Sequence, residues 1–180
     1  MSKTFFTSDT HFNHTNILSY CNPTRPWKTV EEMNKALIDN WNSVVTNDDT
    51  VYHLGDFILG KAEFYDLYEI ISKLKGKIKL IPGNHDTEKK LELYRQFPNI
   101  DILSPLYSLK KPKHIVLCHY PIYTWHHNHL GSWHLHGHCH GYLDREALTM
   151  DVGVDTHPEH RPYTFEEIKD FMKKKKTPLL

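Results

Sequence analysis

The sequence lacks the marks of a membrane protein and of a disulfide-stabilised one. Its three cysteines, Cys21, Cys118 and Cys139, form an odd set without paired spacing, which argues against a disulfide framework and against a Cys-x-x-Cys zinc motif. No apolar run approaches the length that spans a bilayer, and no long apolar stretch precedes Asp9 that would indicate a signal peptide. We therefore expect a cytoplasmic protein in a reducing compartment, with no membrane partner.

The sequence also lacks a net charge, an internal repeat and a linker. Its 22 basic residues balance 22 acidic ones, so no overall field gathers DNA, and extended duplex binding is disfavoured. The lysine run at 173–176 is interpreted as the solvated end of a helix, where cations suit the helix dipole. A chain of 180 residues predicts one domain over residues 1–180 and leaves the oligomeric state open.

Histidine, in contrast, is abundant. The chain has 15 histidines, and histidine is both the commonest metal ligand and the natural proton carrier near neutral pH. A histidine-rich chain can also bind metals without specificity, so the positions of the histidines must decide between these interpretations.

The hydrophobic pattern predicts an α/β protein in which strands and helices alternate first and strands dominate later. Two capping boxes, Thr29–Glu32 and Thr164–Glu167, predict the starts of helices. A long irregular loop is expected over 12–28. The predicted strands are 4–8, 50–54, 77–81, 100–109, 113–118, 133–136 and 148–154, and the other predicted helices are 64–74 and 87–97.

Five short polar motifs each follow a predicted strand or lie in its last residues. Loops at one set of strand ends meet at one edge of an open sheet, so residues far apart in the sequence can converge there. Carboxylates, an amide oxygen and imidazoles suit divalent Mn, Fe, Ni, Co or Zn, and seven such groups fit two metals that share a bridge. The motifs are Asp9-x-His11, Gly55-Asp56, Gly83-Asn84-His85-Asp86, His119 and Gly137-His138-x-His140.

This ordered set resembles the calcineurin-like metallophosphoesterase superfamily, and its spacing is similar to that of small stand-alone members. The resemblance covers residues 9–140 and implies a fold of two packed mixed β-sheets flanked by helices. It also implies that Asp56 bridges two metals and that His85 is not a ligand but faces the leaving oxygen of the substrate. The implied ligands are Asp9, His11 and His140 for one metal and Asn84, His119 and His138 for the other.

The implied activity is hydrolysis of a phosphate ester with two divalent metals, manganese first among the candidates. Two cations about 3.5–4 Å apart neutralise the anionic ester and lower the pKa of a bridging water, and the resulting hydroxide attacks phosphorus. His85 would protonate the leaving alkoxide, an effect of about 10²–10⁴-fold in rate. A catalytically silent metal-binding scaffold of the same fold is the alternative, and the retention of every implied ligand and of His85 argues against it.

The segment after Asp56 departs from one branch of the superfamily. Serine/threonine protein phosphatases continue Gly-Asp with a further Asp and an Arg, whereas Phe57 and Ile58 follow Asp56 here. The departure argues against a protein phosphatase and favours phosphodiesters such as a nucleotide, a cyclic nucleotide or a nucleic-acid end. It also leaves His85 without an obvious orienting partner, because Asp86 is interpreted as the N-cap of the next helix.

Three residues outside the metal motifs are candidates for contacting the substrate: Arg25, His14 and Arg145. Guanidinium matches phosphate geometry, and a surface salt bridge is the alternative for both arginines. Most other histidines and aromatic residues have ordinary interpretations. His134 and His136 either face the site or pack, His53 is a satisfied strand histidine, and Cys139 packs away from the site. Tyr123, Trp125 and Trp133 stack on a base or pack, and His126, His127 and His129 are solvated loop residues.

Overall fold

Two mixed β-sheets pack against each other in the computed structural model, which describes residues 2–60 and 63–176. The first sheet has the strand order β4-β3-β2-β1-β9, with four parallel strands and β9 antiparallel to β1 at one edge. Its strands are β1 (Thr4–Thr7), β2 (Thr50–His53), β3 (Lys77–Leu80), β4 (Ile100–Ile102) and β9 (Tyr163–Thr164).

The second sheet has the order β5-β6-β7-β8. Strands β6, β7 and β8 are parallel, and β5 is antiparallel to β6 at the edge. Its strands are β5 (Leu106–Leu109), β6 (Ile115–Cys118), β7 (Trp133–His136) and β8 (Thr149–Asp151). The two sheets and the flanking helices confirm the predicted fold class. The predicted single domain over 1–180 includes residues 1, 61–62 and 177–180, which lie outside the described residues.

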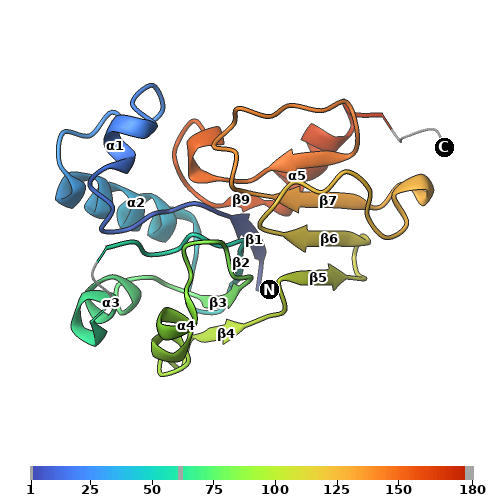
Figure 1. Cartoon of the computed structure of the whole chain (residues 1–180). Coiled ribbons are helices and arrows are strands. Elements are labelled where there is room, and N and C mark those ends of the chain that lie inside the picture. The colour runs from blue at the N-terminus through green and yellow to red at the C-terminus, as the bar shows by residue number, and fades with distance from the viewer. Residues whose placement is uncertain (1, 61–62, 177–180) are drawn as a thin grey trace.

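Helices connect the parallel strands of the first sheet and cover its outer face (Figure 1). Thr29 caps the longest of them, as predicted. The Glu32 carboxylate, however, accepts from the amide of Lys28 and not from that of Thr29, so the predicted capping box is only half formed. The second predicted box, Thr164 with Glu167, is complete. Within the described residues, no helix combines the length and apolar character needed to cross a bilayer. The helices are α1 (Ile17–Tyr20), α2 (Val30–Val44), α3 (Phe64–Ile71), α4 (Glu88–Tyr94) and α5 (Phe165–Met172).

The prediction of one strand over 100–109 is wrong. Strand β4 ends at Ile102 in the first sheet, and β5 begins at Leu106 in the second. The backbone turns at Ser104 and Pro105, because proline has no N–H for a ladder and restricts the residue before it. The chain therefore changes sheets within three residues.

Two further expectations need correction. The loop predicted over 12–28 contains the helical turn α1. The strand predicted over 148–154 ends at Asp151, because its carboxylate binds the Gly153 amide at 2.8 Å and the chain enters the 3₁₀ turn η2 (Val154–Thr156). In the lysine run, Lys175 is half-buried and pairs with Asp144, so this lysine is not simply solvated.

The apolar residues form two layers, as the alternation of side chains along the strands requires. Phe5 of β1 belongs to the cluster between the first sheet and α2, α3 and α4. Its neighbour Phe6 belongs to the cluster between the two sheets, which also includes Leu135 of β7 and Ile168 of α5. Phe6 stacks on Tyr52 of the adjacent strand at 5.6 Å between ring centroids. These layers fix the strands whose ends carry the polar motifs.

Candidate metal centre

The polar motifs lie in sharp turns that follow β1, β2, β3, β6 and β7. The amides of Asp9 and His11 bond to the Gly55 and Asp56 carbonyls, which ties the turn after β1 to the turn after β2. A left-handed backbone costs a non-glycine residue roughly 1–2 kcal/mol, and such strain gathers at functional sites. Five of the seven predicted ligands have this conformation: Asp9 (φ 55°), His11 (φ 48°), Asp56 (φ 54°), His138 (φ 69°) and His140 (φ 47°).

The first predicted ligand group, Asp9, His11 and His140, comes together at the ends of β1 and β7. One ligand atom from each residue lies within 4.8 Å of the others. Asp9 Oδ1 and His11 Nε2 are buried, have no hydrogen-bond partner among the described residues and lie 3.9 Å apart. Buried polar atoms are normally paired, so this orphaned carboxylate oxygen and imidazole nitrogen fit a cation between them.

In the second predicted group, His119 and His138 come together with the predicted bridge Asp56, and one ligand atom from each of these three residues lies within 4.8 Å of the others. The Leu54 carbonyl lies 2.7 Å from His119 Nδ1 and can only accept a hydrogen bond, so Nδ1 is the protonated nitrogen of neutral His119. His119 Nε2 then presents a lone pair, and it lies 3.0 Å from the Asn84 side-chain oxygen. A carboxylate, an amide oxygen and two imidazoles are a donor set that suits a divalent first-row metal.

Asp56 lies between the two groups. Its Oδ2 is 3.6 Å from His11 Nε2 of the first group and 3.5 Å from His119 Nε2 of the second. Its other oxygen accepts the His85 amide at 2.9 Å, which fixes the carboxylate plane. The structure therefore brings all seven predicted ligands to one place, with the predicted bridge in the middle.

Burial controls the electrostatics of the first group. Desolvation raises the pKa of the Asp9 carboxyl to about 8 and holds the pKa of His11 far below its usual range. His140 differs, because desolvation lowers its pKa but hydrogen bonds with Asp155 and Cys21, together with the charges of Asp9 and Asp155, outweigh it and raise the pKa to about 10. A buried carboxylate whose charged form is so unfavourable fits a site that receives positive charge from a bound ion.

Asp155 supports this group, and the sequence interpretation gave it no role. Its Oδ2 accepts the His140 Nδ1 proton at 2.8 Å, which leaves Nε2 of His140 for a metal. Both of its oxygens also accept from Arg25, at 2.7 and 2.8 Å. Gly153-Val154-Asp155 follows a strand as the other motifs do, and this was the signal that could have identified it.

The prediction that Arg25 contacts the substrate is wrong. The arginine is 2% exposed and forms a buried ion pair with Asp155, so the alternative of a surface salt bridge is also wrong. Its remaining donors reach the Asp9 carbonyl, the Thr10 carbonyl and the Met33 sulfur, at 2.6, 3.1 and 3.3 Å. All five N–H groups of the guanidinium are used, which leaves none for a phosphate. Arg25 instead fixes the turn that carries Asp9.

The interpretation of Asp86 as a helix N-cap is also wrong. Thr87 occupies the N-cap position of α4, without a side-chain hydrogen bond. Asp86 is buried and accepts the amides of Asp56, Phe57 and Gly83, at 2.7, 3.3 and 2.9 Å. Three backbone donors stabilise a buried carboxylate better than one cap would, so Asp86 holds the turns after β2 and β3 together.

His85 stands at the open side of the site, with its side chain 46% exposed. Its Nε2 lies 3.9 Å from Asp56 Oδ2, too far for a hydrogen bond. Its backbone is held at both ends, since its amide donates to Asp56 and its carbonyl accepts from the buried Lys90 ammonium at 3.0 Å. Lys90, which also bonds the Ile58 carbonyl at 2.8 Å, is a further residue that sequence reasoning missed.

The two other candidates for substrate contact lie in different loops, His14 after β1 and Arg145 between β7 and β8. The Nδ1 atom of half-buried His14 is 3.2 Å from His11 Nδ1. Arg145 donates to the Ile122 and Tyr123 carbonyls, at 3.0 and 3.2 Å, and its guanidinium lies 4.8 Å from the centre of the Tyr123 ring. Contact between substrate and either residue stays a prediction.

The neighbouring histidines and aromatic residues mostly have structural partners. His134 packs, because the Val116 carbonyl and the Ile122 amide occupy its two ring nitrogens. His136 Nδ1 bonds the Gly137 carbonyl, and His53 is satisfied at Nε2 by Thr10 but not at Nδ1. Trp125 and Trp133 are buried, so these two indoles pack and do not offer a face to a base. Cys139 is half-buried.

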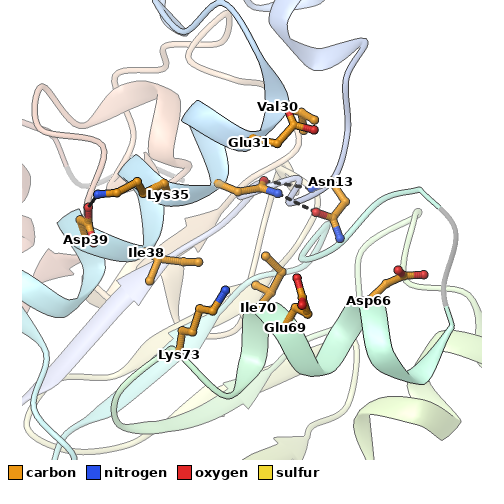
Figure 2. Close-up of a pocket in the computed structure, with 11 residues that line it drawn as sticks. Asn13, Val30, Glu31, Lys35, Ile38, Asp39, Asp66, Glu69, Ile70 and Lys73 are labelled. Carbon is orange, nitrogen blue, oxygen red and sulfur yellow. Dashed lines mark hydrogen bonds and ion pairs between the residues drawn. The ribbon is translucent and has the colours of Figure 1, made fainter.

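A separate hollow of about 580 Å³ lies between α2 and α3 (Figure 2). Lys35, Asp39, Glu69 and Lys73 give its lining charges of both signs. Asn34 joins it to the turn after β1, because its side-chain amide donates to Asn13 Oδ1 at 2.6 Å and its oxygen accepts the Asn13 amide. None of the seven predicted ligands lines this hollow.

Comparisons with known proteins extend over nearly the whole chain. The sequence model of the calcineurin-like phosphoesterase family matches residues 2–176. An uncharacterised protein of Methanocaldococcus jannaschii is 37% identical over 183 residues, covering 98% of this chain and 94% of that protein. The gene 66 protein of Mycobacterium phage D29 is 27% identical, with coverage of 86% and 89%. A crystal structure of a protein of unknown function from Aquifex aeolicus has a TM-score of 0.73 at 26% identity, and the match covers 95% of this chain and 100% of that one. The family match includes both sheets and all seven predicted ligand positions.

Proposed function

The chain belongs to the calcineurin-like phosphoesterase family, and we propose that it hydrolyses phosphodiesters with two divalent metal ions. Manganese is the metal we expect first, with iron, nickel, cobalt or zinc suited to the same ligand types. In this proposal Asp9, His11 and His140 hold one ion, Asn84, His119 and His138 hold the other, and Asp56 bridges them.

The position of Asp56 carries the proposal. Its Oδ2 lies at nearly the same distance from His11 of one group and His119 of the other, 3.6 and 3.5 Å. Such a carboxylate can join two cations, whereas a single structural ion would not use both groups. The orphaned atoms of Asp9 and His11 support the same interpretation, because one cation between them would satisfy both.

The site has a buried side and an open side, and the two have different roles. Asp9, His11, Asp56 and His119 are buried, so their donor atoms are fixed before substrate arrives. When bound, two divalent ions would neutralise the phosphate charge and make hydroxide available near neutral pH. His85 lies on the open side, where a protonated imidazole can donate to the leaving oxygen and accelerate the reaction about 10²–10⁴-fold.

The preference for diesters rests on what surrounds Asp56 and His85. The residues that follow Asp56 are the apolar and buried Phe57 and Ile58. This turn therefore carries no guanidinium that could bind a phosphate dianion. Proton donation by a general acid accelerates hydrolysis most when the leaving group is an alkoxide. A nucleotide, a cyclic nucleotide and a nucleic-acid end all have such a leaving group. A cyclic nucleotide and the last linkage at a nucleic-acid end are phosphodiesters, and a nucleotide belongs to the class that we propose where its phosphate is esterified twice.

The experiment measures metal-dependent hydrolysis by the purified protein. Bis-p-nitrophenyl phosphate, p-nitrophenyl phosphate and a nucleotide panel are assayed with Mn²⁺ and with chelator. We expect turnover that needs metal and that Asp56→Asn abolishes. We expect His85→Ala to lower kcat about 10²–10⁴-fold on diesters with alkoxide leaving groups, and much less on p-nitrophenyl esters, because p-nitrophenolate leaves without a proton.

A matched control is His129→Ala, which removes an exposed histidine from the loop between β6 and β7 and should leave kcat unchanged. Absence of metal-dependent turnover on every substrate would contradict the proposed enzymatic activity and favour the catalytically silent scaffold. Equal losses on alkoxide and p-nitrophenolate leaving groups would remove His85 as the proton donor. Faster turnover of the monoester than of any diester would overturn the diester preference.

A further inference from the structure

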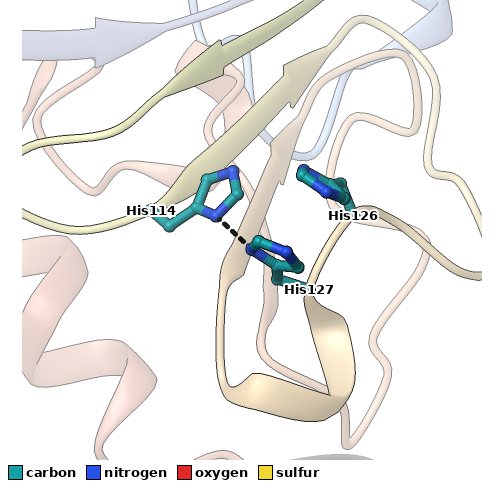
Figure 3. A group of neighbouring side chains, drawn as sticks. All are labelled: His114, His126 and His127. Atoms are coloured by element: carbon teal, nitrogen blue, oxygen red, sulfur yellow. Dashed lines mark hydrogen bonds between the residues drawn. The ribbon is translucent and has the colours of Figure 1, made fainter.

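Three histidines meet at the far end of β6 from the candidate metal centre (Figure 3). His114 precedes β6, while His126 and His127 lie in the loop between β6 and β7, and one nitrogen from each lies within 4.8 Å of the others. His114 Nδ1 is 3.1 Å from His127 Nδ1, and the His126 and His127 rings stack with centroids 3.8 Å apart. The sequence interpretation of His126 and His127 as solvated loop residues is correct about exposure but missed this cluster.

The spacing of the nitrogens suits one metal ion. In a tetrahedral zinc site with Zn–N bonds of about 2.0–2.1 Å, neighbouring nitrogens lie roughly 3.3 Å apart. The His114–His127 pair is hydrogen-bonded at 3.1 Å, close to this separation, and a metal would replace the proton between the two nitrogens. Rotation of the exposed His126 ring can bring the third nitrogen closer without moving the backbone.

The loop that carries His126 and His127 is held in place independently of any ion. Ser132 binds it twice, with its hydroxyl donating to the His126 carbonyl at 2.7 Å and its amide donating to the His127 carbonyl at 3.1 Å. The buried Trp125 indole donates to the Ser132 carbonyl at 3.2 Å. The backbone of His127 is left-handed, with φ at 61°. The backbone of the loop is therefore held so that two neighbouring imidazoles lie beside His114.

The cluster is separate from the candidate metal centre. His114 and His119 flank β6, and five residues of extended chain at 3.3 Å each place them roughly 16 Å apart. The seven predicted ligands all follow the carboxyl ends of their strands. His114, in contrast, precedes β6, and His126 and His127 precede β7. The same loop connects the two places, because it begins beside His119 and reaches His126 and His127 before β7.

We propose that His114, His126 and His127 form an additional metal site for a divalent ion of the zinc class. Three imidazoles without a carboxylate select zinc, copper or nickel over magnesium, calcium or manganese. Burial, with the neighbouring His127, His126 and lysines, lowers the pKa of His114, which favours the neutral form that binds a metal. A bound ion would tie the loop to the start of β6 and leave a fourth position open to water.

Zinc stoichiometry tests the proposal. The wild-type protein and its variants are dialysed against the same zinc buffer, and the zinc per chain is measured by elemental analysis. The metal centre contributes equally to every protein, so the difference between them reports the additional site. We expect His114→Ala and His127→Asn each to lose one zinc per chain. Asparagine is chosen at 127 because it tolerates the left-handed backbone.

His129→Ala is the matched control, since it removes an exposed histidine of the same loop that lies outside the cluster. It should bind as much zinc as the wild type. Circular dichroism and the thermal midpoint in chelator identify any variant that fails to fold, and His126→Ala then replaces it. The proposal is overturned if the folded cluster variants bind as much zinc as the wild type, or if His129→Ala loses as much zinc as they do. Neither result depends on phosphoesterase activity.

Discussion

At the scale of single residues, the candidate metal centre depends on carboxylates that are not predicted ligands. Asp155 accepts from His140 and Arg25, and Asp86 accepts the amides that shape the turns after β2 and β3. Both are buried, so each must be fully paired to persist as an anion. Their role is to hold the ligands in place before an ion binds.

Replacement of Asp155 by asparagine tests this role. The variant keeps the size of the side chain but removes the charge that pairs with fully buried Arg25, so we expect the free energy of unfolding to fall by about 3–5 kcal/mol. His140 also loses its orienting carboxylate, and we expect Mn²⁺ affinity to fall about 10–100-fold. Urea denaturation in chelator and Mn²⁺ titration measure the two effects separately.

Asp101→Asn is the matched control, because Asp101 is exposed and pairs with Lys79 across neighbouring strands. An exposed pair contributes about 0–1 kcal/mol, and this one has no link to the metal centre. If Asp155→Asn lost stability while its Mn²⁺ affinity equalled that of Asp101→Asn, Asp155 would stabilise the fold without positioning His140.

At the scale of elements, the turns after the strands need residues without a side chain. A Cβ on Gly137, at the end of β7, would overlap the Ser8 hydroxyl and the Asp9 carboxylate, which follow β1. The two sheets therefore approach each other closely where the candidate ligands lie. The amide of Gly137 also donates to the His119 carbonyl at 2.9 Å, which ties the end of β7 to that of β6.

Gly137→Ala should therefore damage the metal centre more than the fold. We expect the added methyl to displace Asp9, to weaken Mn²⁺ binding and to lower the free energy of unfolding by about 1–3 kcal/mol. Gly131→Ala is the control, since within the described part of the chain no atom beyond its two chain neighbours lies within 4 Å of the added Cβ, and only its left-handed backbone, with φ at 81°, is strained. Unchanged Mn²⁺ affinity in Gly137→Ala would contradict the close approach of the sheets.

The elements also indicate how much a sequence can predict. Strands β1, β2 and β3 and the helices between them follow from periodicity and caps, because local pattern and tertiary role agree there. The sequence analysis missed the division between β4 and β5, although Pro105 indicates a break there, because both halves are β-prone and only packing assigns them to different sheets. The prediction that Arg25 contacts the substrate failed for a related reason. Its partner Asp155 lies 130 residues away, and nothing in the local sequence indicates that Arg25 is buried.

The same limit applies to the site. The shared position of the motifs after strands predicted that seven residues would converge, since strand ends meet at a sheet edge. It could not predict which groups hold them there. Asp86 adjoins a helix start, so its sequence suggests a cap, whereas the contacts that decide its role come from Asp56, Phe57 and Gly83.

At the scale of the whole molecule, the candidate ligands come from both sheets. Asp9, Asp56 and Asn84 follow strands of the first sheet, whereas His119, His138 and His140 follow strands of the second. Each predicted metal has ligands from both. Bound ions would therefore connect the sheets and stabilise the native state relative to the unfolded one.

Metal removal should accordingly lower the thermal midpoint of unfolding. An ion present at about 100 times its Kd contributes about 2.7 kcal/mol, which corresponds to roughly 5–10 °C for a chain of this size. We expect this rise when Mn²⁺ is added to chelator-treated protein, measured by circular dichroism. The shift should be largely absent in Asp56→Asn, and an equal shift in that variant would show that Mn²⁺ binds elsewhere.

The three-residue passage from β4 to β5 has a consequence for dividing the protein. A chain cut between Ile102 and Leu106 would yield two fragments, each containing nearly all of one sheet. Asp9, His11, Asp56 and Asn84 would belong to one fragment, and His119, His138 and His140 to the other. Neither fragment would carry a complete ligand set for either ion. Metal binding would then be detected only when both fragments are present and reassembled.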